Sequence, residues 1–424
     1  MLDPDFGWHL QTGNYIRQHG IPAHDLYSYT AQNFRWIDHE WGNDVLVSLF
    51  YSFGGFFLVS ILYAGLWTFS LLINSLKNRM LVLLLATLAL LPYAGVRAIT
   101  WTVLFFALLL KILSSHNKQI KYFIPVLFIA WANLHAGFIA GLALLAYFAI
   151  KKKSRLLIVI LLVSLGATLV NPYGLRLYSE VFRTVFDSSL HSQITEWGYI
   201  TFTIKAATFV VLWATGFWIF ARRPLKNWLG LGPILLAASV SASRNIPLFV
   251  IVTTNDLNTY WEKFKDELPD KAAKAKKIII FVLVTVVLIW ISGLTYLEFQ
   301  DLPWKDREQN YPEQAVDYLQ KHPCKGQLFN SYNYGGYLIW KLPRQPVFID
   351  GRMPTWKNGQ GQKYLNIYFK IFDDQNYQQQ KFAEYNVRCV LISDSSDNHK
   401  TIANLKASGW KPVVRANGSV LLTN

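Results

Sequence analysis

The chain has 424 residues, of which 52% are hydrophobic and 16% aromatic, and its formal net charge is +15. This composition, with its apolar residues gathered in long runs, excludes a disordered chain and indicates a protein that crosses a membrane several times. The charge does not indicate nucleic-acid binding, because most Lys and Arg residues lie in short loops between apolar runs and form no basic stripe with aromatic residues.

Residues 1–54 are predicted to form an outer first loop with interfacial helices. No apolar run precedes this polar segment, so the sequence shows no secretory signal. We expect either that a first transmembrane helix is missing, or that the next span inserts with its N-terminus outward. The loop contains many ionisable side chains, and a cluster of such residues beside a membrane indicates a functional site. They include Asp3, Asp5, His9, His39 and Glu40.

Residues 55–297 are predicted to form an all-α polytopic transmembrane bundle of about ten spans. The apolar runs Gly55–Leu76 and Ile278–Leu294 are long enough for a hydrocarbon layer of about 30 Å. Basic clusters between the runs predict cytoplasmic loops, which leaves the first loop and the tail outside a cell membrane. Longer runs predict hairpins of two short helices. We expect hairpins in Met80–Leu110, Tyr122–Ile150 and Leu229–Asn255, and single spans in Leu156–Asn171 and Ala206–Phe220.

Polar residues fall at the outer tips of these hairpins and in the adjoining outer loop. A charge costs about 2.5 to 3.5 kcal/mol at the bilayer centre and much less at the interface. We therefore expect these side chains to line a substrate path, although arginines that only reach lipid headgroups are the structural alternative. The set comprises Arg97, Asn133, His135, Glu196, Arg244 and Asn245.

Residues 298–424 are predicted to be a soluble extracytoplasmic α/β domain, because helical and extended patterns alternate. Strands are expected at Gln327–Asn330, Pro346–Asp350 and Arg388–Ser393, followed by a hairpin at Pro412–Thr423. Helices are expected at Pro312–Lys321, Gly336–Lys341, Tyr364–Phe372, Gln378–Tyr385 and His399–Ser408.

Two features of this domain bear on function. In a parallel sheet Asn330, Asp350 and Asp394 would share the carboxyl edge, where ligands bind. Asp350 and Arg352 are therefore candidates for contact with acceptor or carrier, and a pair that fixes a loop is the alternative. Cys324 and Cys389, the two cysteines of the chain, can form a disulfide outside the cell or stay buried and free.

The first loop also carries a family resemblance. It is similar to the first outer loop of membrane glycosyltransferases of the GT-C superfamily, which includes oligosaccharyltransferase catalytic subunits and protein mannosyltransferases. The similar stretches are Asp3-Pro-Asp5-x-x-Trp8-His9-Leu10, Ile16-Arg-Gln-His-Gly20-Ile-Pro22-x-His24-Asp25 and His39-Glu40-Trp41. Asn171-Pro-Tyr-Gly174, Glu196-Trp197, Arg244-Asn245 and Gly335-Gly336-Tyr337 occur in similar order in an uncharacterised bacterial branch of GT-C-like proteins.

The resemblance implies a GT-C-like fold and an enzyme, a glycosyltransferase of the cell envelope. Such an enzyme moves a sugar from a polyprenyl-phosphate donor to an acceptor on the outer face, here a glycan, lipid or protein. It also implies that Asp3 or Asp5 is essential, as a base or as a metal ligand. The WWDYG signature of oligosaccharyltransferases is replaced by Asn333-Tyr334-Gly335-Gly336-Tyr337, so recognition of an asparagine sequon is not expected. The paired glycines predict a tight turn or a close approach to a ligand.

Glycosyl transfer needs a carboxylate for the acceptor and a cation for the leaving lipid phosphate. Asp5 or Glu40 can supply the carboxylate, and Arg97 and Arg244 can bind the phosphate bidentately.

A second arrangement uses a metal ion. Asp3 and Asp5 can share Mn²⁺ or Mg²⁺, with His9 or Glu196 completing the shell. The structural alternatives are that Asp3-Pro-Asp5 only begins a helix, and that His39-Glu40 begins an interfacial helix at Trp41. A lipid or glycan transporter, a flippase, or a non-catalytic assembly partner are the competing functions.

Overall fold

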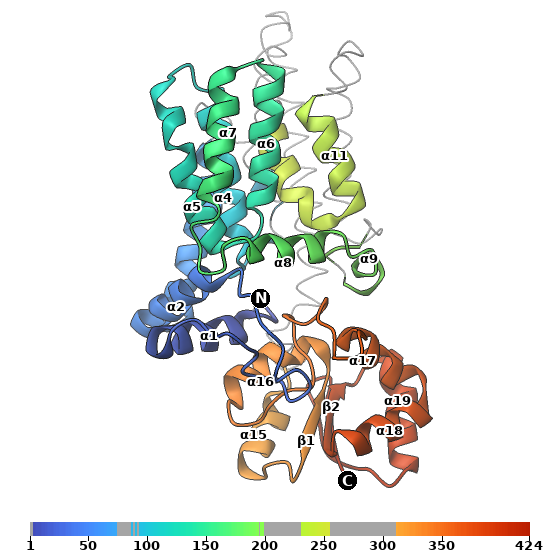
Figure 1. Cartoon of the computed structure of the whole chain (residues 1–424). Helices are drawn as coiled ribbons and strands as arrows, with labels where there is room; N and C mark the ends of the chain where they lie inside the picture. Colours follow the sequence, from blue (N-terminus) through green and yellow to red (C-terminus); the bar gives the residue numbers. More distant parts are fainter. Residues whose placement is uncertain are drawn as a thin grey trace, which may run out of the picture. The chain divides into compact units, whose positions relative to one another are not determined.

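The computed structural model describes residues 3–73, 86, 87, 90, 93–194, 196–198, 230–254 and 311–424 (Figure 1). The chain forms two compact units. The first comprises Met1–Val59, Phe182–Thr184 and Leu297–Asn424, and the second comprises Ser60–Val181 and Val185–Tyr296. The first loop and the tail, which the sequence analysis treated separately, therefore share one unit.

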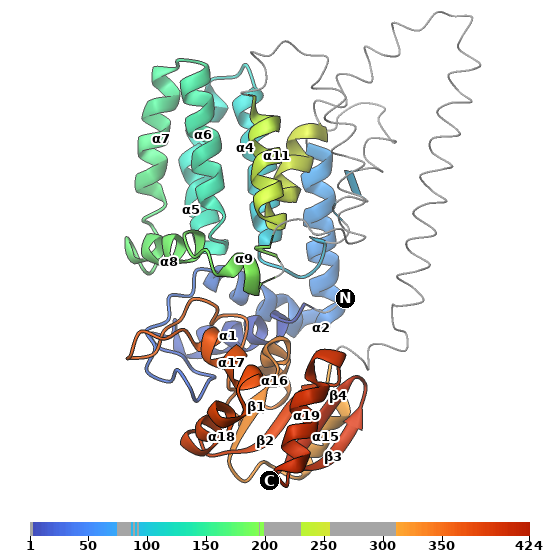
Figure 2. The same cartoon turned by 90° about the vertical axis from the view of Figure 1, so that its right-hand side faces the viewer.

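Helices of the second unit pack side by side (Figures 1 and 2). They are α4 (Ile99–Ser114), α5 (Ile124–Leu134), α6 (Phe138–Lys151) and α7 (Arg155–Ala167), with the 3₁₀ helix η2 (Gln119–Phe123) leading into α5. The extended backbone of His135 ends α5, and α6 begins after Gly137, which confirms the hairpin predicted in Tyr122–Ile150. The unit also contains α8 (Arg176–Val185), most of which belongs to it, and α9 (Leu190–Gln193).

The hairpin predicted around Arg244 and Asn245 is also present. Helix α11 (Leu231–Ser241) ends at Ala242, whose backbone is extended, and η4 (Ser243–Asn245) turns the chain into the helical residues 246–254. Of the other hairpin, in Met80–Leu110, the second helix is described as α4. The predicted spans Ala206–Phe220 and Ile278–Leu294 lie outside the described residues.

Among the described helices, only α2 (Trp41–Ile73) is long and apolar enough to cross a membrane. Only 17% of its most apolar window is buried, which is unlike the core helix of a soluble protein. Non-helical backbone at Gly54 and Gly55 divides α2, and the φ of 60° at Gly55 is one that glycine adopts readily. The break separates the predicted interfacial helix Trp41–Phe50 from the apolar run that begins at Gly55, as the sequence predicted. The count of about ten spans stays a prediction.

The tail is an α/β domain, as predicted. Its sheet has the order β1-β2-β4-β3, with β1 (Gln327–Asn330) parallel to β2 (Val387–Ser393), and β4 (Ser419–Thr423) antiparallel to both β2 and β3 (Lys411–Ala416). Asn417 and Gly418, both with positive φ, join β3 to β4, as the Asn-Gly hairpin turn requires. The helices are α15 (Glu313–Lys321), α16 (Gly335–Lys341), α17 (Tyr364–Asp373), α18 (Gln375–Glu384) and α19 (His399–Ala407).

The prediction of a strand at Pro346–Asp350 was wrong. This segment makes only an isolated bridge, between Val347 and Ser28. On its other side the Asn330 amide donates to the Ile349 carbonyl (2.9 Å), and its Oδ1 accepts from the Phe348 N–H (2.8 Å). The Asn330 side chain thus makes the hydrogen bonds to these backbone groups that a neighbouring strand would otherwise make.

The paired glycines of the tail support packing between helices. Helix α1 (Phe6–His19) lies against α16. A Cβ on Gly336 would collide with the Pro4 carbonyl, and one on Gly7 with the Gly336 carbonyl. The close approach predicted for Gly335-Gly336 is therefore made to the chain's own backbone.

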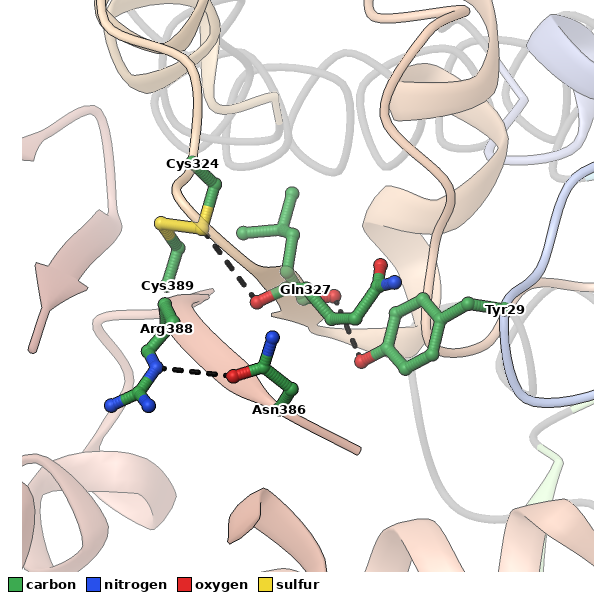
Figure 3. The surroundings of a disulfide bond; sticks show 7 residues. Tyr29, Cys324, Gln327, Asn386, Arg388 and Cys389 are labelled. Carbon is green, nitrogen blue, oxygen red and sulfur yellow. Dashed lines mark hydrogen bonds between the residues drawn. A yellow bond between two sulfur atoms is a disulfide. The ribbon is translucent and has the colours of Figure 1, made fainter. Parts of the chain in front are cut away.

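A disulfide joins Cys324 to Cys389, which is one of the two alternatives that the sequence left open (Figure 3). It links the segment before β1 to β2. Nearby, the Tyr29 hydroxyl donates to the Leu328 carbonyl of β1 (3.3 Å), so the first loop contacts this sheet through a side chain, in addition to its Ser28 bridge to Val347 outside the sheet.

Candidate active site

Acidic residues of the first loop surround a buried histidine. His9 lies on α1, Asp44 on the first turn of α2, and Glu40 and Asp38 in the segment before it. His9 Nδ1 is 2.5 Å from Asp44 Oδ1, and its Nε2 is 3.6 Å from Glu40 Oε2. The His9 ring packs on the Trp8 ring at 3.7 Å between centroids. We name His9, Asp38, Glu40 and Asp44 the His9 cluster.

Burial dominates the electrostatics of this cluster. It raises the pKa of Glu40 to about 8; the nearby carboxylates of Asp44, Asp38 and Asp5 act in the same direction, and His9 opposes them. Burial also raises the pKa of Asp38 well above its usual range, and Asp44 adds to this. Asp38 Oδ2 and Asp44 Oδ2 are buried, and no described residue is placed to donate a hydrogen bond to them, so the charged form of Asp38 is disfavoured.

The raised pKa of Glu40 predicts a pH-dependent stability. In the unfolded chain Glu40 loses its proton near pH 4.5, but in the folded chain only near pH 8. Between these values folding takes up a proton, so stability should fall as the pH rises. Glu40→Gln, which mimics the protonated acid, should remove this part of the slope. Thermal melts of the detergent-solubilised protein at pH 5 and pH 8 test this, and an unchanged slope in the variant would contradict it.

His39 lies beside the cluster, with its Nε2 3.6 Å from Glu40 Oε1. Asp3 and Asp5 instead support the start of α1. Asp3 Oδ1 accepts from the Asp5 N–H (2.9 Å), and Asp5 Oδ1 accepts from Trp8 Nε1 (3.0 Å). This geometry matches the helix-start alternative. The Asp5 charge also raises the pKa of Glu40.

These residues do not fit the predicted metal site. Asp3 and Asp5 are held in separate hydrogen bonds, and within residues 3–73 and the other described ranges no three His, Cys, Asp or Glu side chains are placed to hold a metal ion. A role for Mn²⁺ or Mg²⁺ stays a prediction.

Asp350 and Arg352 form a buried ion-pair group with a residue of the first loop. The Arg352 guanidinium makes two hydrogen bonds to Asp350 (2.8 and 2.7 Å) and an ion pair with Asp25 (2.7 Å). This matches the structural alternative for the pair, because the contacts attach the tail to the loop. Three aromatic rings enclose the guanidinium at 4.7 to 5.3 Å; they belong to Tyr27, Trp36 and Trp356.

The second unit has a cavity of about 60 Å³ that is lined by three of the predicted residues, His135, Arg244 and Asn245, together with Thr102 and apolar groups. Thr102 Oγ1 lies 2.6 Å from His135 Nδ1, which also accepts from the Gly137 N–H (3.0 Å). This network assigns the proton of the neutral imidazole to Nε2.

The residues predicted for the hairpin tips and the adjoining loop contact the backbone and one another. Arg97 pairs with Glu196 at 2.5 Å. The Arg244 guanidinium stacks on the Trp197 ring at 4.1 Å, and the Arg244 N–H donates to the Glu196 carbonyl. Asn133 donates to backbone carbonyls of Ile129 and Val170, and Asn245 to that of Ala238.

No family model and no curated protein matches the sequence. Among solved structures, archaeal oligosaccharyltransferase AglB from Archaeoglobus fulgidus, in complex with an inhibitory peptide and a dolichol-phosphate, matches 95% of this chain with a TM-score of 0.56 at 12% identity. The fold resembles that of AglB. A second structure of the Archaeoglobus fulgidus oligosaccharyltransferase, tethered to an acceptor peptide containing the NVT sequon, matches 96% of the chain at a TM-score of 0.56 and 11% identity. The fold is therefore similar to that of these oligosaccharyltransferases, in agreement with the fold that the sequence resemblance implies.

The likeness to AglB has a limited extent. This chain spans 66% of the length of the first AglB structure and 67% of the second. At these identities the similarity concerns the fold alone, so the activity of the chain is taken up below as a proposal.

Four residues of these arrangements were not predicted as site residues from the sequence, namely Asp25, Asp38, Asp44 and Thr102. From the sequence, Asp44 is an acidic residue in the first turn of a predicted interfacial helix. Such a position indicates only a favourable interaction with the helix dipole. Its contact with His9 joins residues 35 positions apart, and no local pattern reports it.

Proposed function

We propose that the protein is a membrane glycosyltransferase that moves a sugar from a polyprenyl-phosphate donor to an acceptor hydroxyl or amide on the extracytoplasmic face. The observation that carries this proposal is a buried carboxylate cluster in the first loop of a chain with an AglB-like fold. A dolichol-phosphate, which is a polyprenyl phosphate, occupies the first AglB structure, and this supports the same donor class here.

Glu40 is the proposed base that takes the proton of the acceptor. A pKa near 8 keeps this carboxyl close to the operating pH, where proton transfer is most efficient. The Asp44 carboxylate orients His9, and the His9 Nε2 faces the same Glu40 carboxylate. Asp5 adds negative charge beside Glu40 and so raises its basicity. The sugar carbon then forms its bond to the acceptor as the bond to the lipid phosphate breaks.

Arg244 is the proposed ligand of the carrier phosphate. It lines the cavity with His135, and the described cavity residues include no acidic side chain that would repel a phosphate. A guanidinium binds two phosphate oxygens at once, and an imidazole Nε2–H can donate to a third.

Arg244→Ala should therefore weaken binding of a polyprenyl phosphate by about tenfold to a hundredfold, the range for a lost charged hydrogen bond of about 1.5 to 3 kcal/mol. Binding can be measured with a fluorescent short-chain polyprenyl phosphate in neutral detergent. Arg176→Ala, which removes an exposed arginine from α8, is the matched control. Equal affinities in the two variants would contradict the assignment, and displacement of the probe by a soluble nucleotide sugar would contradict the donor class.

A further inference from the structure

One end of the second unit carries positive charges from four elements. It lies where α4 and α6 end and where η2 and α7 begin, and these elements pack on one another. From Asp44 to Glu180 the sequence contains no acidic residue, so the same elements provide no neutralising carboxylate. The charged residues, here named the basic end, are Lys111, Lys118, Lys121, Lys151, Lys152, Lys153 and Arg155.

The middle lysine of the basic end ties two helices together. Lys152, which follows the last residue of α6, donates from Nζ to the Leu113 carbonyl near the end of α4 (2.7 Å). Burial lowers the pKa of Lys152, and so do the positive charges of Lys121 and Lys151. Like charges are therefore crowded here, and a bound anion would relieve their repulsion.

Lys153 keeps a charge at a position where the backbone favours glycine. Its φ is 46°, in the left-handed region, and its N–H donates to the Ile150 carbonyl as the chain leaves α6. Helices usually place Gly or Asn at such a position. A lysine in this backbone conformation costs free energy, and within the described structure the Lys153 charge makes no contact that offsets this cost.

Exposed apolar side chains lie beside these charges. Ile120, Tyr122 and Phe123 of η2 are 40%, 62% and 65% exposed, and Ile150 at the end of α6 is 77% exposed. Basic and exposed aromatic or aliphatic side chains occur together where a protein enters a lipid interface. A free phosphate would use the lysines alone, whereas a phospholipid would use both groups.

We propose that the basic end is a binding surface for anionic phospholipid. Lys121, Lys151 and Lys153 contact the headgroup phosphates, and Phe123 and Ile150 lie against the acyl chains. Lys152 holds α6 to α4 and keeps the other lysines in place.

The test compares two triple variants of the full chain with the same loss of charge. One is Lys121→Gln/Lys151→Gln/Lys153→Gly, in which glycine suits the left-handed backbone and so protects the fold. The control removes three exposed lysines of the C-terminal domain, Lys400, Lys406 and Lys411, as glutamines. Each delipidated protein is titrated in neutral detergent with a fluorescent phosphatidylglycerol, with phosphatidylcholine and inorganic phosphate as competitors.

The first variant should bind phosphatidylglycerol at least about tenfold more weakly than the wild type, since each basic residue near an anionic surface contributes roughly a fivefold factor. The control should bind like the wild type, and neither competitor should displace the probe at matched concentrations. An equal loss in both variants would show general charge attraction and overturn the proposal. Displacement by inorganic phosphate would show a free-anion site and would overturn it as well.

Discussion

Asp5→Asn is expected to lower the rate of sugar transfer, by less than the roughly hundredfold or more that follows loss of the base itself, while the protein stays folded. The asparagine Oδ1 can still accept from Trp8 Nε1, so the start of α1 is preserved. The negative charge beside Glu40 is lost, and with it part of the basicity of that carboxyl. The rate is measured with a labelled polyprenyl-phosphate sugar in vesicles, and folding by thermal melting.

Asp3→Asn is the matched control for this prediction. Asp3 accepts the Asp5 N–H through Oδ1, which an asparagine can also do, and the largest effects on the pKa of Glu40 come from burial, His9 and the carboxylates of Asp44, Asp38 and Asp5. Its rate should stay close to the wild-type rate. Near-normal transfer by the Asp5 variant would remove this residue from the mechanism, and an equal loss in both variants would indicate a shared role such as a bound ion.

Arg352→Met is expected to be the most destabilising single change in the first unit. It leaves Asp25 and Asp350 buried without their cation, which costs about 3 to 5 kcal/mol when one partner of a buried pair is removed. The Arg352 side chain is 2% exposed, so water cannot solvate the two carboxylates in its place. The change should lower the melting temperature by several degrees and release the first loop from the tail, which limited proteolysis would detect.

Arg415→Met provides the comparison for the buried pair. Arg415 also forms a two-bonded pair with an aspartate, Asp394, but its side chain is 54% exposed. Exposed pairs are screened by water and contribute little, so this variant should melt like the wild type. Adding Asp25→Asn and Asp350→Asn to Arg352→Met should recover part of the lost stability. Equal melting of the Arg352 and Arg415 variants would show that burial does not set the strength of these pairs.

Local patterns in the sequence predicted most elements of the described fold. The break between α5 and α6 followed from polar residues inside a long apolar run, and the strands β3 and β4 lie within the hairpin predicted at Pro412–Thr423, with β3 beginning one residue earlier. The segment Pro346–Asp350 was predicted wrongly because an apolar run flanked by turn residues looks like a strand. Its partner is the Asn330 side chain, which no pattern of hydrophobicity can identify.

The candidate site was predicted in its residue types more than in its contacts. His9, Glu40 and Asp5 were recognised because ionisable residues are rare beside a membrane. Their arrangement around Asp44 depends on α1 packing against the start of α2, which is a tertiary contact. The third member of the Asp350 and Arg352 group could not be predicted for the same reason, since Asp25, which pairs with Arg352, lies more than three hundred residues earlier.

The most direct test of the central claim is sugar transfer by the purified protein in liposomes. A polyprenyl-phosphate donor with a labelled sugar is incubated with membrane extracts as a source of acceptor, with and without a chelator of Mn²⁺ and Mg²⁺. We predict that label moves from the lipid to an acceptor with the wild-type protein and about a hundredfold more slowly with Glu40→Gln. Label that stays on the lipid, or donor that crosses the bilayer unchanged at the same rate in both proteins, would contradict a glycosyltransferase.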